Sequence, residues 1–249
     1  MFESKNNQVI LVTGAAKRIG SEIINLFHAK NFNVIIHYNK SAAEANRLCG
    51  NLNSKRRKSA MLVQGDLNQP ICVKRVISLV ESVGRIDVLV NNASSFYPTA
   101  LESANESHWN DLINSNLKGP FFLSKELAPL LRKSNGSIVN ISDMHARQTL
   151  KEHSIYTIAK AGNIAMTKSL ALELAPEVRV NSVAPGAILW PAHEKDDKLK
   201  HDKILASVPL GRLGSESDIA ETTFFLSNVA TYVTGQTITV DGGASGSLL

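Results

Sequence analysis

The sequence is poor in cysteine and has no long hydrophobic run. Its 249 residues include two cysteines, Cys49 and Cys72, which cannot build the disulfide framework of a small secreted protein. The chain therefore fits a reducing compartment, and we expect a cytoplasmic protein. No apolar run reaches the roughly 18 residues of a membrane span, and residues 1–7 are polar rather than signal-like, so no membrane association is predicted.

Metal-ligand spacings and a strong charge bias are also absent. The seven histidines include no His-x-x-x-His pair and the two cysteines are far apart, so no metal site is predicted. There are 27 Lys+Arg against 22 Asp+Glu, a net charge of only +5. Residues 55–58 form a basic cluster, but it has no interleaved aromatic residues and lies in an expected connection. We therefore predict a solvated loop and no nucleic-acid binding.

Composition and length indicate a globular protein. Hydrophobic residues make up 43% of the chain and charged residues 20%, values typical of a folded domain. A length of 249 residues fits one α/β domain, so we predict a single domain over residues 1–249. Short β-branched runs recur, separated by segments with helical spacing. The runs are residues 9–13, 34–37, 61–64, 86–90, 137–141, 178–183 and 237–240.

The alternation of strands and helices predicts the fold class. Such alternation forms βαβ units, and hence a parallel sheet covered on both faces. We expect an α/β fold: a single doubly wound, Rossmann-like parallel sheet of about seven strands with helices on both faces. Two expected helices have an apolar face. The first face comprises Ile19, Ile23, Ile24, Leu26 and Phe27, and the second Ile158, Ala161, Ile164, Ala165, Thr167 and Leu172.

A glycine turn follows the first expected strand. Residues 13–20 read Thr-Gly-Ala-Ala-Lys-Arg-Ile-Gly and open the first helix. A strand, a tight glycine turn and a helix N-terminus direct backbone N–H groups and the positive end of the helix dipole toward a phosphate. The sequence therefore predicts a dinucleotide site that includes Gly14, Lys17, Arg18, Ile19 and Gly20.

The acid that usually holds the ribose 2′-hydroxyl of such a cofactor is missing. No Asp or Glu occurs between Glu22 and Glu44, where the second strand ends. A carboxylate would repel a 2′-phosphate, whereas a lysine and a serine can bind one. We therefore predict NADPH/NADP+ as the cofactor, with the alternative that the lysine is only a solvated charge. The predicted contacts are Tyr38, Asn39, Lys40 and Ser41.

Tyr156 and Lys160 are four residues apart in an expected helix, so they share one face. An ammonium beside a phenol favours the phenolate, so we expect Lys160 to lower the pKa of Tyr156 from its usual value of about 10. Such a tyrosine suits proton transfer near neutral pH. The pair alone is a common surface arrangement, and it gains weight only from the motifs around it.

Further motifs follow the glycine turn. They are Asp66-Leu67, Asn91-Asn92-Ala93, Asn116, Tyr156…Lys160, Val180-Asn181…Pro185-Gly186 and Asp241-Gly242-Gly243. Their order and spacing resemble the short-chain dehydrogenase/reductase superfamily over nearly the whole chain, which implies a homotetramer. The resemblance also implies catalytic roles for Asn116, Tyr156 and Lys160. It implies cofactor contacts for Asp66, Leu67, Asn92, Ala93, Tyr156, Lys160, Pro185 and Gly186, although Pro185-Gly186 could equally be only a turn.

Two positions depart from the usual pattern of that superfamily. Arg18 stands where most members have a third glycine, and Asp143, thirteen residues before Tyr156, stands where most have a catalytic serine. Ser142 is one residue off register, and such a shift on a strand turns the side chain to the opposite face. Both departures resemble the pteridine reductase branch, as do residues 13–20, 37–45 and 91–99.

The resemblance to pteridine reductases implies a role for several residues. Arg18 and Ser94 would each contact both cofactor and pterin, and Phe96 would stack on the pterin ring. Asp143 would work with the tyrosine in proton delivery, and Lys160 would hold the nicotinamide ribose. The structural alternatives are a hydrogen-bonding role for Asp143 and core packing for Phe96.

The chemistry favours a pterin over a keto substrate. A carboxylate at position 143 would repel the oxyanion that develops on a carbonyl substrate. A pterin offers an imine nitrogen, and its ring N–H groups can donate to that carboxylate. We therefore expect NADPH to transfer hydride to a pterin C=N carbon while Tyr156, with Asp143 and Lys160, supplies the proton to nitrogen.

Three functions stay open at this point. We predict NADPH-dependent reduction of dihydrobiopterin or dihydromonapterin, with dihydrofolate as a further candidate, to the tetrahydro form. The first alternative is a carbonyl reductase acting on a 3-oxoacyl thioester. The second is an NADPH-binding regulator without turnover, although a sensor needs no proton donor. The charged run at residues 194–203 could be a lid over the substrate or an exposed helix.

Overall fold

The β-branched runs form the strands of a central parallel sheet. The computed structural model describes residues 1–4, 6–188 and 198–246, and the strand order is β3-β2-β1-β4-β5-β6-β7. Every neighbouring pair is parallel, which confirms the predicted doubly wound α/β sheet. The strands are β1 (Val9–Val12), β2 (Asn33–Tyr38), β3 (Ala60–Gln64), β4 (Val88–Asn91), β5 (Ser137–Ile141), β6 (Arg179–Pro185) and β7 (Thr237–Val240).

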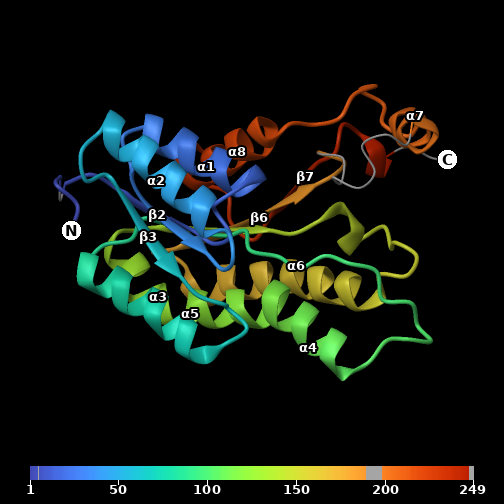
Figure 1. Ribbon diagram of the computed structural model, residues 1–249, viewed down its shortest axis with the longest axis horizontal. Coiled ribbons are helices and arrows are strands. Elements are labelled where there is room, and N and C mark those ends of the chain that lie inside the picture. Colours follow the sequence, from blue (N-terminus) through green and yellow to red (C-terminus); the bar gives the residue numbers. More distant parts are fainter. Residues whose placement is uncertain (5, 189–197, 247–249) are drawn as a thin grey trace.

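Helices cover both faces of this sheet (Figure 1). One face carries α1 (Arg18–Ala29), α2 (Ala42–Lys55) and α8 (Glu216–Phe224), and the other carries α3 (Pro70–Val83), α5 (Gly119–Lys133) and α6 (Ser154–Leu174). Because all the strands run parallel, the loops that follow them lie along one edge of the sheet. The other helical elements are α4 (Glu106–Ile113), α7 (Lys198–Ala206), η1 (Asn114–Lys118), η2 (Met144–Ala146), η4 (Phe225–Val229) and η5 (Ala244–Gly246).

The side chains of each strand alternate between two hydrophobic cores. Along β1, Ile10 and Val12 enter the core beneath α1, α2 and α8, whereas Val9 and Leu11 enter the core beneath α3, α5 and α6. Successive strand residues point to opposite faces of a sheet, so a strand covered on both sides is apolar throughout. This explains the continuous apolar runs in the sequence.

The two predicted helix faces have different outcomes. On α1, Ile23, Ile24 and Phe27 are fully buried, which confirms the first face. The residues of the second predicted face all lie on α6, but Ile158 is 49% and Leu172 84% exposed, whereas Thr167 is buried. The opposite side of α6 faces the sheet and mixes apolar with polar side chains, so the apolar spacing marks mainly the exposed side of this helix. Its buried residues include Tyr156, Lys160, Asn163, Met166, Leu170 and Leu174.

Arg56, one member of the basic cluster at residues 55–58, is not solvated like the rest of the cluster. Its guanidinium donates hydrogen bonds to the Phe32 carbonyl and, over 3.0 Å, to Asn33 Oδ1. These contacts join the end of α2 to the start of β2, and burial lowers the pKa of Arg56. The other three residues of the cluster are exposed, as a solvated loop requires.

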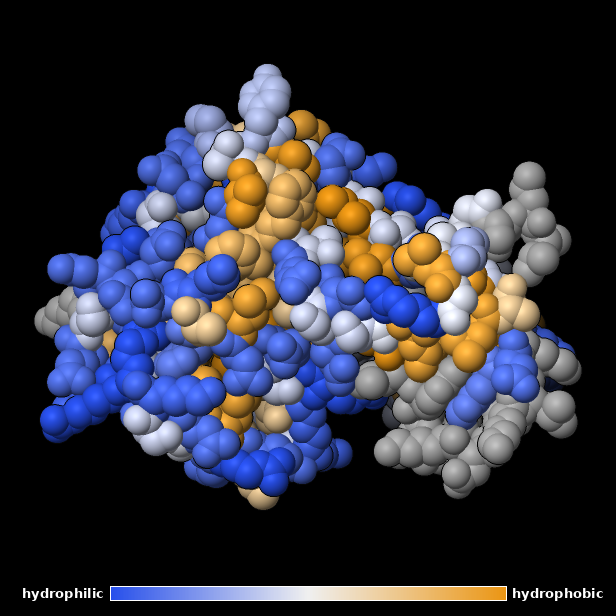
Figure 2. All heavy atoms as spheres, turned by 90° about the horizontal axis from the view of Figure 1, so that it is seen from above, coloured by the Kyte–Doolittle hydropathy of each residue, from blue (hydrophilic) through white to orange (hydrophobic). Residues whose placement is uncertain are grey.

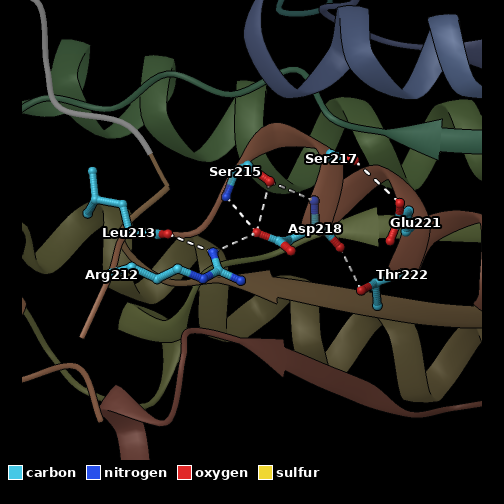
Figure 3. A network of polar contacts seen from close by, with 7 residues as sticks. All are labelled: Arg212, Leu213, Ser215, Ser217, Asp218, Glu221 and Thr222. Atoms are coloured by element: carbon cyan, nitrogen blue, oxygen red, sulfur yellow. Dashed lines mark hydrogen bonds and ion pairs between the residues drawn. The ribbon is translucent and has the colours of Figure 1, made fainter. Parts of the chain in front are cut away.

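A capping network fixes the start of α8 (Figure 3). Ser215 Oγ accepts the Asp218 N–H at 3.2 Å, and Asp218 Oδ2 accepts the Ser215 N–H at 2.7 Å. Arg212 Nη1 lies 3.3 Å from the same carboxylate oxygen. Just before the cap, the Gly214 N–H donates to the Ala187 carbonyl at 3.0 Å. The chain that leaves β6 is thus tied to the chain that enters α8.

The predicted charged run at residues 194–203 divides between two regions. Residues 194–197 lie outside the described residues. Residues 198–203 belong to α7, which agrees with the helical alternative for this part of the run.

Exposed hydrophobic residues gather in patches. An apolar groove between α5 and α6 is lined by Leu117, Phe121, Phe122, Ala165 and Met166. On the face seen in Figure 2, hydrophobic residues also form a band between hydrophilic areas. Contiguous apolar patches of this kind mark interaction surfaces. None of the helices in the described part of the chain has the length and apolarity needed to cross a membrane.

Candidate active site

The candidate site lies where the strand order reverses. From β1 the sheet continues to β2 and β3 on one side, and to β4, β5, β6 and β7 on the other. The connections after β1 and β4 therefore diverge toward opposite faces of the sheet. The crevice between them, outside the carboxyl ends of the strands, is where open parallel α/β sheets bind ligands.

Thr13 and Asn92 join the two loops across this crevice. Thr13 Oγ1 accepts the backbone N–H groups of Asn92 at 2.9 Å and Ala93 at 3.0 Å. The Asn92 amide donates in return to the carbonyls of Thr13 and Gly14 at 2.8 and 3.1 Å. Asn92 and Ala93, which are predicted cofactor contacts, thus hold the glycine turn in place.

The glycine turn needs glycine at both of its ends. Gly14 has a φ of +62°, and a Cβ there would lie 2.9 Å from the Ala93 Cα. A Cβ on Gly20 would lie 2.6 Å from the Gly14 carbonyl oxygen. Ile19 packs against the core beneath α1. No side chain caps the N-terminus of α1 and no acid lies in its first turn, so its first N–H groups suit an anion.

Arg18 begins α1 in the left-handed region, with a φ of +53°. A residue with a Cβ pays about 1–2 kcal/mol for this conformation, which glycine adopts freely. This explains why the superfamily that the sequence resembles usually has glycine at position 18. Strain of this kind concentrates at functional sites, so the exposed guanidinium at this helix N-terminus is a candidate ligand contact.

Lys17 has a partner already. Its Nζ lies 2.6 Å from Glu44 Oε1 of α2, and the hydrogen bond to Lys17 lowers the pKa of that carboxyl. Solvent-exposed ion pairs are weak, so a phosphate at the helix N-terminus can compete for the ammonium. The Lys17 ammonium has two further donors, so its predicted phosphate contact can use one of them or replace this pair.

The residues predicted to hold a 2′-phosphate follow β2. Tyr38 is half-buried against the core, whereas Asn39 and Lys40 are exposed. Ser41 precedes α2 but makes no side-chain cap. One ammonium and one hydroxyl thus stand next to the first turn of a helix, a suitable donor set for a phosphate.

Asp66 and Leu67 follow β3 at the same edge. Asp66 Oδ1 accepts the Asn68 N–H at 3.0 Å, and Leu67 is buried. The Asn68 amide donates to Asp111 Oδ1 at 2.9 Å, and the Tyr97 hydroxyl donates to Asp111 Oδ2 at 3.0 Å. This network links the predicted cofactor residues after β3 to the loop after β4.

Ser94 and Asn116 come from different motifs and meet in the site. Ser94 Oγ donates to Asn116 Oδ1 at 2.6 Å, and the Asn116 amide donates to the Ser95 and Leu112 carbonyls, both at 2.9 Å. The Asn163 amide of α6 donates to the Asn116 carbonyl at 3.2 Å. Asn116 lies in the π-helical turn η1, a rare geometry that is frequent at functional sites.

Asp143 and Tyr156 are in direct contact. The Tyr156 hydroxyl donates to Asp143 Oδ2 at 2.6 Å, and Asp143 Oδ1 accepts the His145 N–H at 2.8 Å. Ser142 is buried, and its hydroxyl donates to the Val183 carbonyl at 3.1 Å. The one-residue shift thus has the expected consequence, and the tyrosine hydroxyl bonds to Asp143.

The prediction of a lowered pKa for Tyr156 is wrong. Burial, the charge of Asp143 and the hydrogen bond to Asp143 raise the pKa of Tyr156 well above 10.0, and a hydrogen bond with Ser94 opposes them. These influences favour the neutral phenol. Lys160 does not reverse them, because its Nζ lies 5.7 Å from the ring centroid and donates to the Ile141 carbonyl at 2.9 Å. Tyr156 is therefore a protonated hydroxyl at neutral pH.

Lys160 carries a costly buried charge. Burial lowers its pKa from 10.5 to about 8, and the charge of Asp143 acts in the opposite direction. An ammonium has three donors, and the Ile141 carbonyl takes one of them. The remaining donors suit ligand hydroxyl groups such as those of a ribose.

Phe96 lies on the surface, so the core-packing explanation for it is wrong. Its side chain is 52% exposed. The His153 ring stacks on it, with centroids 4.8 Å apart and an interplanar angle of 20°, and the Tyr156 ring meets it edge-on at 4.8 Å. The three rings form one wall beside the Tyr156 hydroxyl.

Pro185 and Gly186 end β6 at the same edge of the sheet. The Gly186 N–H donates to the Val240 carbonyl at 2.9 Å. A Cβ on Gly186 would lie 2.5 Å from the Asp241 Cβ, so the close approach of the two segments requires glycine. The turn explanation accounts for this geometry without a ligand.

Sequence reasoning missed Thr13, His37 and His153. The hydroxyl of Thr13, directly before the glycine turn, was a usable signal, because strand-end hydroxyls often hold neighbouring loops. His37 and His153 gave no signal, since their partners Gly14, Gly65 and Phe96 are distant in sequence. In the described parts of the chain, no three His, Cys, Asp or Glu side chains gather as a metal site.

Replacing Arg18 by glycine is expected to separate stability from binding. The Arg18→Gly variant should gain about 1 kcal/mol of unfolding free energy, because it relieves the positive φ, and should bind NADPH more weakly. Denaturant unfolding and fluorescence titration measure the two effects. Lys58→Gly is the matched control, because Lys58 has a φ of +49° outside the site. It should gain stability with unchanged binding; unchanged NADPH binding in Arg18→Gly would contradict the assignment.

Replacing Lys160 by methionine is expected to stabilise the ligand-free protein. The wild-type lysine has a folded pKa of about 8 against 10.5 unfolded, so the unfolded state binds more protons between these values. Wild-type stability should therefore rise from pH 8 to 10.5, and that slope should vanish in Lys160→Met. At pH 7 the variant should gain up to about 3 kcal/mol, less the lost hydrogen bond. Denaturant unfolding at both pH values is the test, and equal slopes would refute it.

Comparison with known proteins agrees with this geometry. A family model described as enoyl-(acyl carrier protein) reductase matches residues 14–245. Pteridine reductase 1 from Leishmania tarentolae is 38% identical over 98% of this chain and 99% of its own. The 3-oxoacyl-(acyl-carrier-protein) reductases FabG of Staphylococcus epidermidis and Thermotoga maritima are each 37% identical over 95% of this chain, and over 98% and 97% of their own. The chain therefore belongs to the short-chain dehydrogenase/reductase superfamily of NAD(P)-dependent oxidoreductases.

Proposed function

We propose that the protein is an NADPH-dependent pteridine reductase that acts on dihydrobiopterin, dihydromonapterin or dihydrofolate. The hydrogen bond of 2.6 Å between Tyr156 and Asp143 carries the proposal. A carboxylate beside the proton donor opposes an oxyanion but accepts hydrogen bonds from the ring N–H groups of a pterin. The similarity to a pteridine reductase over nearly the full length of both chains supports the same conclusion.

The residues at the crevice fit NADPH. The uncapped N-terminus of α1 and the guanidinium of Arg18 suit the pyrophosphate. Lys40 and Ser41 suit the 2′-phosphate, and Lys160 suits a ribose. Bound there, NADPH would supply the hydride to a ring C=N carbon of the pterin.

Tyr156 would deliver the proton. Its raised pKa keeps the hydroxyl protonated, so it can protonate the ring nitrogen as hydride arrives. The buried ammonium of Lys160 lies 5.7 Å from the phenol ring and would stabilise the phenolate that remains. Phe96 presents an exposed aromatic surface, and offset stacking with a flat ring adds about 0.5–1.5 kcal/mol beyond area burial.

A carbonyl reductase of 3-oxoacyl thioesters is the second candidate. The identity to two such reductases, 37%, is almost equal to the 38% identity to the pteridine reductase. Asn116, Tyr156 and Lys160 could serve either reaction. Asp143 is the residue that argues against a keto substrate.

A cytoplasmic homotetramer completes the proposal. Phe121, Phe122 and Ile158 expose 40%, 43% and 49% of their side chains on the outer sides of α5 and α6. Burial of this face between copies of the chain would remove it from water. The thiols of Cys49 and Cys72 are unpaired, which fits a reducing compartment.

The substrate is tested by initial rates of NADPH oxidation. Dihydrobiopterin or dihydromonapterin should be consumed faster than an acetoacetyl thioester. Tyr156→Phe should lose about 100-fold or more in rate, because it lacks the proton donor. Asp143→Ser should lose pterin turnover and gain thioester turnover, whereas the control Ser142→Ala should change neither. Faster thioester turnover by the wild type would support the carbonyl reductase, and NADPH binding without turnover of either substrate would support a regulator.

The cofactor preference is tested by titrating the protein with NADPH and with NADH. The wild type should bind NADPH more tightly, and Lys40→Glu should weaken NADPH about tenfold or more, because a charge-assisted hydrogen bond is replaced by repulsion. Binding of NADH should not weaken. Lys74→Glu, with the same charge change on the exposed side of α3, is the control. Equally tight binding of both cofactors by the wild type would reject the preference.

A further inference from the structure

His37 is a buried side chain of β2 that joins the loop after β1 to the loop after β3. It lies in β2 with 2% of its surface exposed. Its Nδ1 lies 3.1 Å from the backbone nitrogen of Gly14, in the turn after β1, and its Nε2 lies 2.9 Å from the carbonyl oxygen of Gly65, after β3. Its own carbonyl accepts the Ala15 N–H at 2.8 Å.

These contacts fix the tautomer of the ring. The Gly65 carbonyl can only accept, so Nε2 carries the hydrogen. The Gly14 N–H can only donate, so Nδ1 offers its lone pair. Burial lowers the pKa of His37 to about 4, against weaker raising effects from Gly65 and Asp66, so the ring stays neutral at physiological pH. A protonated ring would lose the acceptor that Gly14 needs.

The two loops and the end of β2 all lie next to predicted cofactor residues. Gly14 is the first glycine of the glycine turn, and Gly65 directly precedes Asp66. His37 directly precedes Tyr38, the first of the predicted 2′-phosphate contacts. Gly65 lies against α3, where a Cβ added to it would be 2.7 Å from the Cys72 Cβ, and its own N–H donates to the Tyr38 carbonyl at 3.0 Å. The ring therefore connects Gly14 to a segment that is itself packed on α3 and hydrogen-bonded to β2.

We infer that His37 is a positioning residue for the cofactor: its neutral ring holds the glycine turn at Gly14 in a fixed position relative to the predicted 2′-phosphate contacts that follow β2. The inference rests on the proposed cofactor site but on neither proposed substrate. Without the ring acceptor, the Gly14 N–H would seek another partner. The turn and the helix N-terminus that follows it would then lose their fixed position.

Three substitutions separate the two hydrogen bonds of the ring. His37→Leu removes both. His37→Asn places an acceptor oxygen close to the position of Nδ1, whereas His37→Gln extends an amide donor toward Gly65. We expect His37→Leu to raise the Kd for NADPH about tenfold or more, which corresponds to about 1.4 kcal/mol. His37→Asn should recover most of this loss, and His37→Gln should recover little.

The matched control is a second buried histidine among the described residues. His28 of α1 is 6% exposed, and its Nε2 lies 2.7 Å from Ser59 Oγ, away from the cofactor loops. His28→Leu should lower the Tm and leave the Kd for NADPH unchanged. A change in Kd that follows Tm across all variants would overturn the inference, as would equal Kd values for His37→Asn and His37→Gln.

The wild-type protein provides a measurement that does not depend on variants. Nitrogen-15 spectra of the histidine rings should show the Nε2–H tautomer for His37, and a hydrogen on Nδ1 would overturn the inference. If the wild type binds neither NADPH nor NADH, the proposed cofactor site fails and this inference fails with it. If the wild type binds NADPH and His37→Leu binds it equally well, only this inference fails.

Discussion

The reciprocal contact between Thr13 and Asn92 is the constraint on which the candidate site depends. A parallel sheet whose strand order reverses leaves its two central loops free to separate, because their helices pack on opposite faces. Thr13 Oγ1 accepts two N–H groups from the loop after β4, and the Asn92 amide donates to two carbonyls of the glycine turn. One loop carries the predicted phosphate contacts and the other carries Ser94 and Phe96. These hydrogen bonds therefore fix the glycine turn relative to the loop that carries Ser94 and Phe96 in the ligand-free protein.

The catalytic side of the crevice has a different physical basis, a polar cluster buried in one helix face. Tyr156, Lys160 and Asn163 lie on the inner side of α6, where burial makes each unpaired polar group expensive. The Tyr156 hydroxyl donates to Asp143, the Lys160 ammonium donates to a backbone carbonyl, and Asn163 Nδ2 donates to the carbonyl of Asn116. Asn163 Oδ1 has no hydrogen-bond partner among the described residues. Asp143 also accepts the His145 N–H, and Asn116 also donates to the Ser95 carbonyl, so two of these partners hold a neighbouring turn or loop. The proposed proton transfer would therefore use hydrogen bonds that also support the local structure.

The fold could be predicted from the sequence, because burial on both faces makes each strand of a parallel sheet a continuous apolar run. On α6 the apolar spacing marked mainly the exposed side, because the side that faces the sheet mixes polar with apolar residues while the outer side carries Ile158 and Leu172. The register argument at Ser142 and Asp143 succeeded because side-chain alternation is a local property of an extended chain. The pKa of Tyr156 could not be predicted from its spacing to Lys160. The direction of that shift depends on which charged group reaches the hydroxyl, and the carboxylate reaches it while the ammonium turns to Ile141. His37 and His153 were missed because their contacts arise only when distant segments meet.

The two departures from the superfamily pattern share an energetic feature. Arg18 adopts a backbone conformation that glycine would adopt without strain, and Asp143 places a carboxylate beside a buried phenol whose ionisation it opposes. The exposed guanidinium of Arg18 at the helix N-terminus suits an anionic group, and the carboxylate of Asp143 suits a ligand rich in N–H donors. A dinucleotide phosphate beside a pterin ring presents both, whereas a keto thioester presents no N–H donor near its reacting carbonyl. The hydrogen bond between Asp143 and Tyr156 is therefore the strongest physical argument for the pteridine proposal, because Arg18 would contact the same cofactor in either candidate reaction.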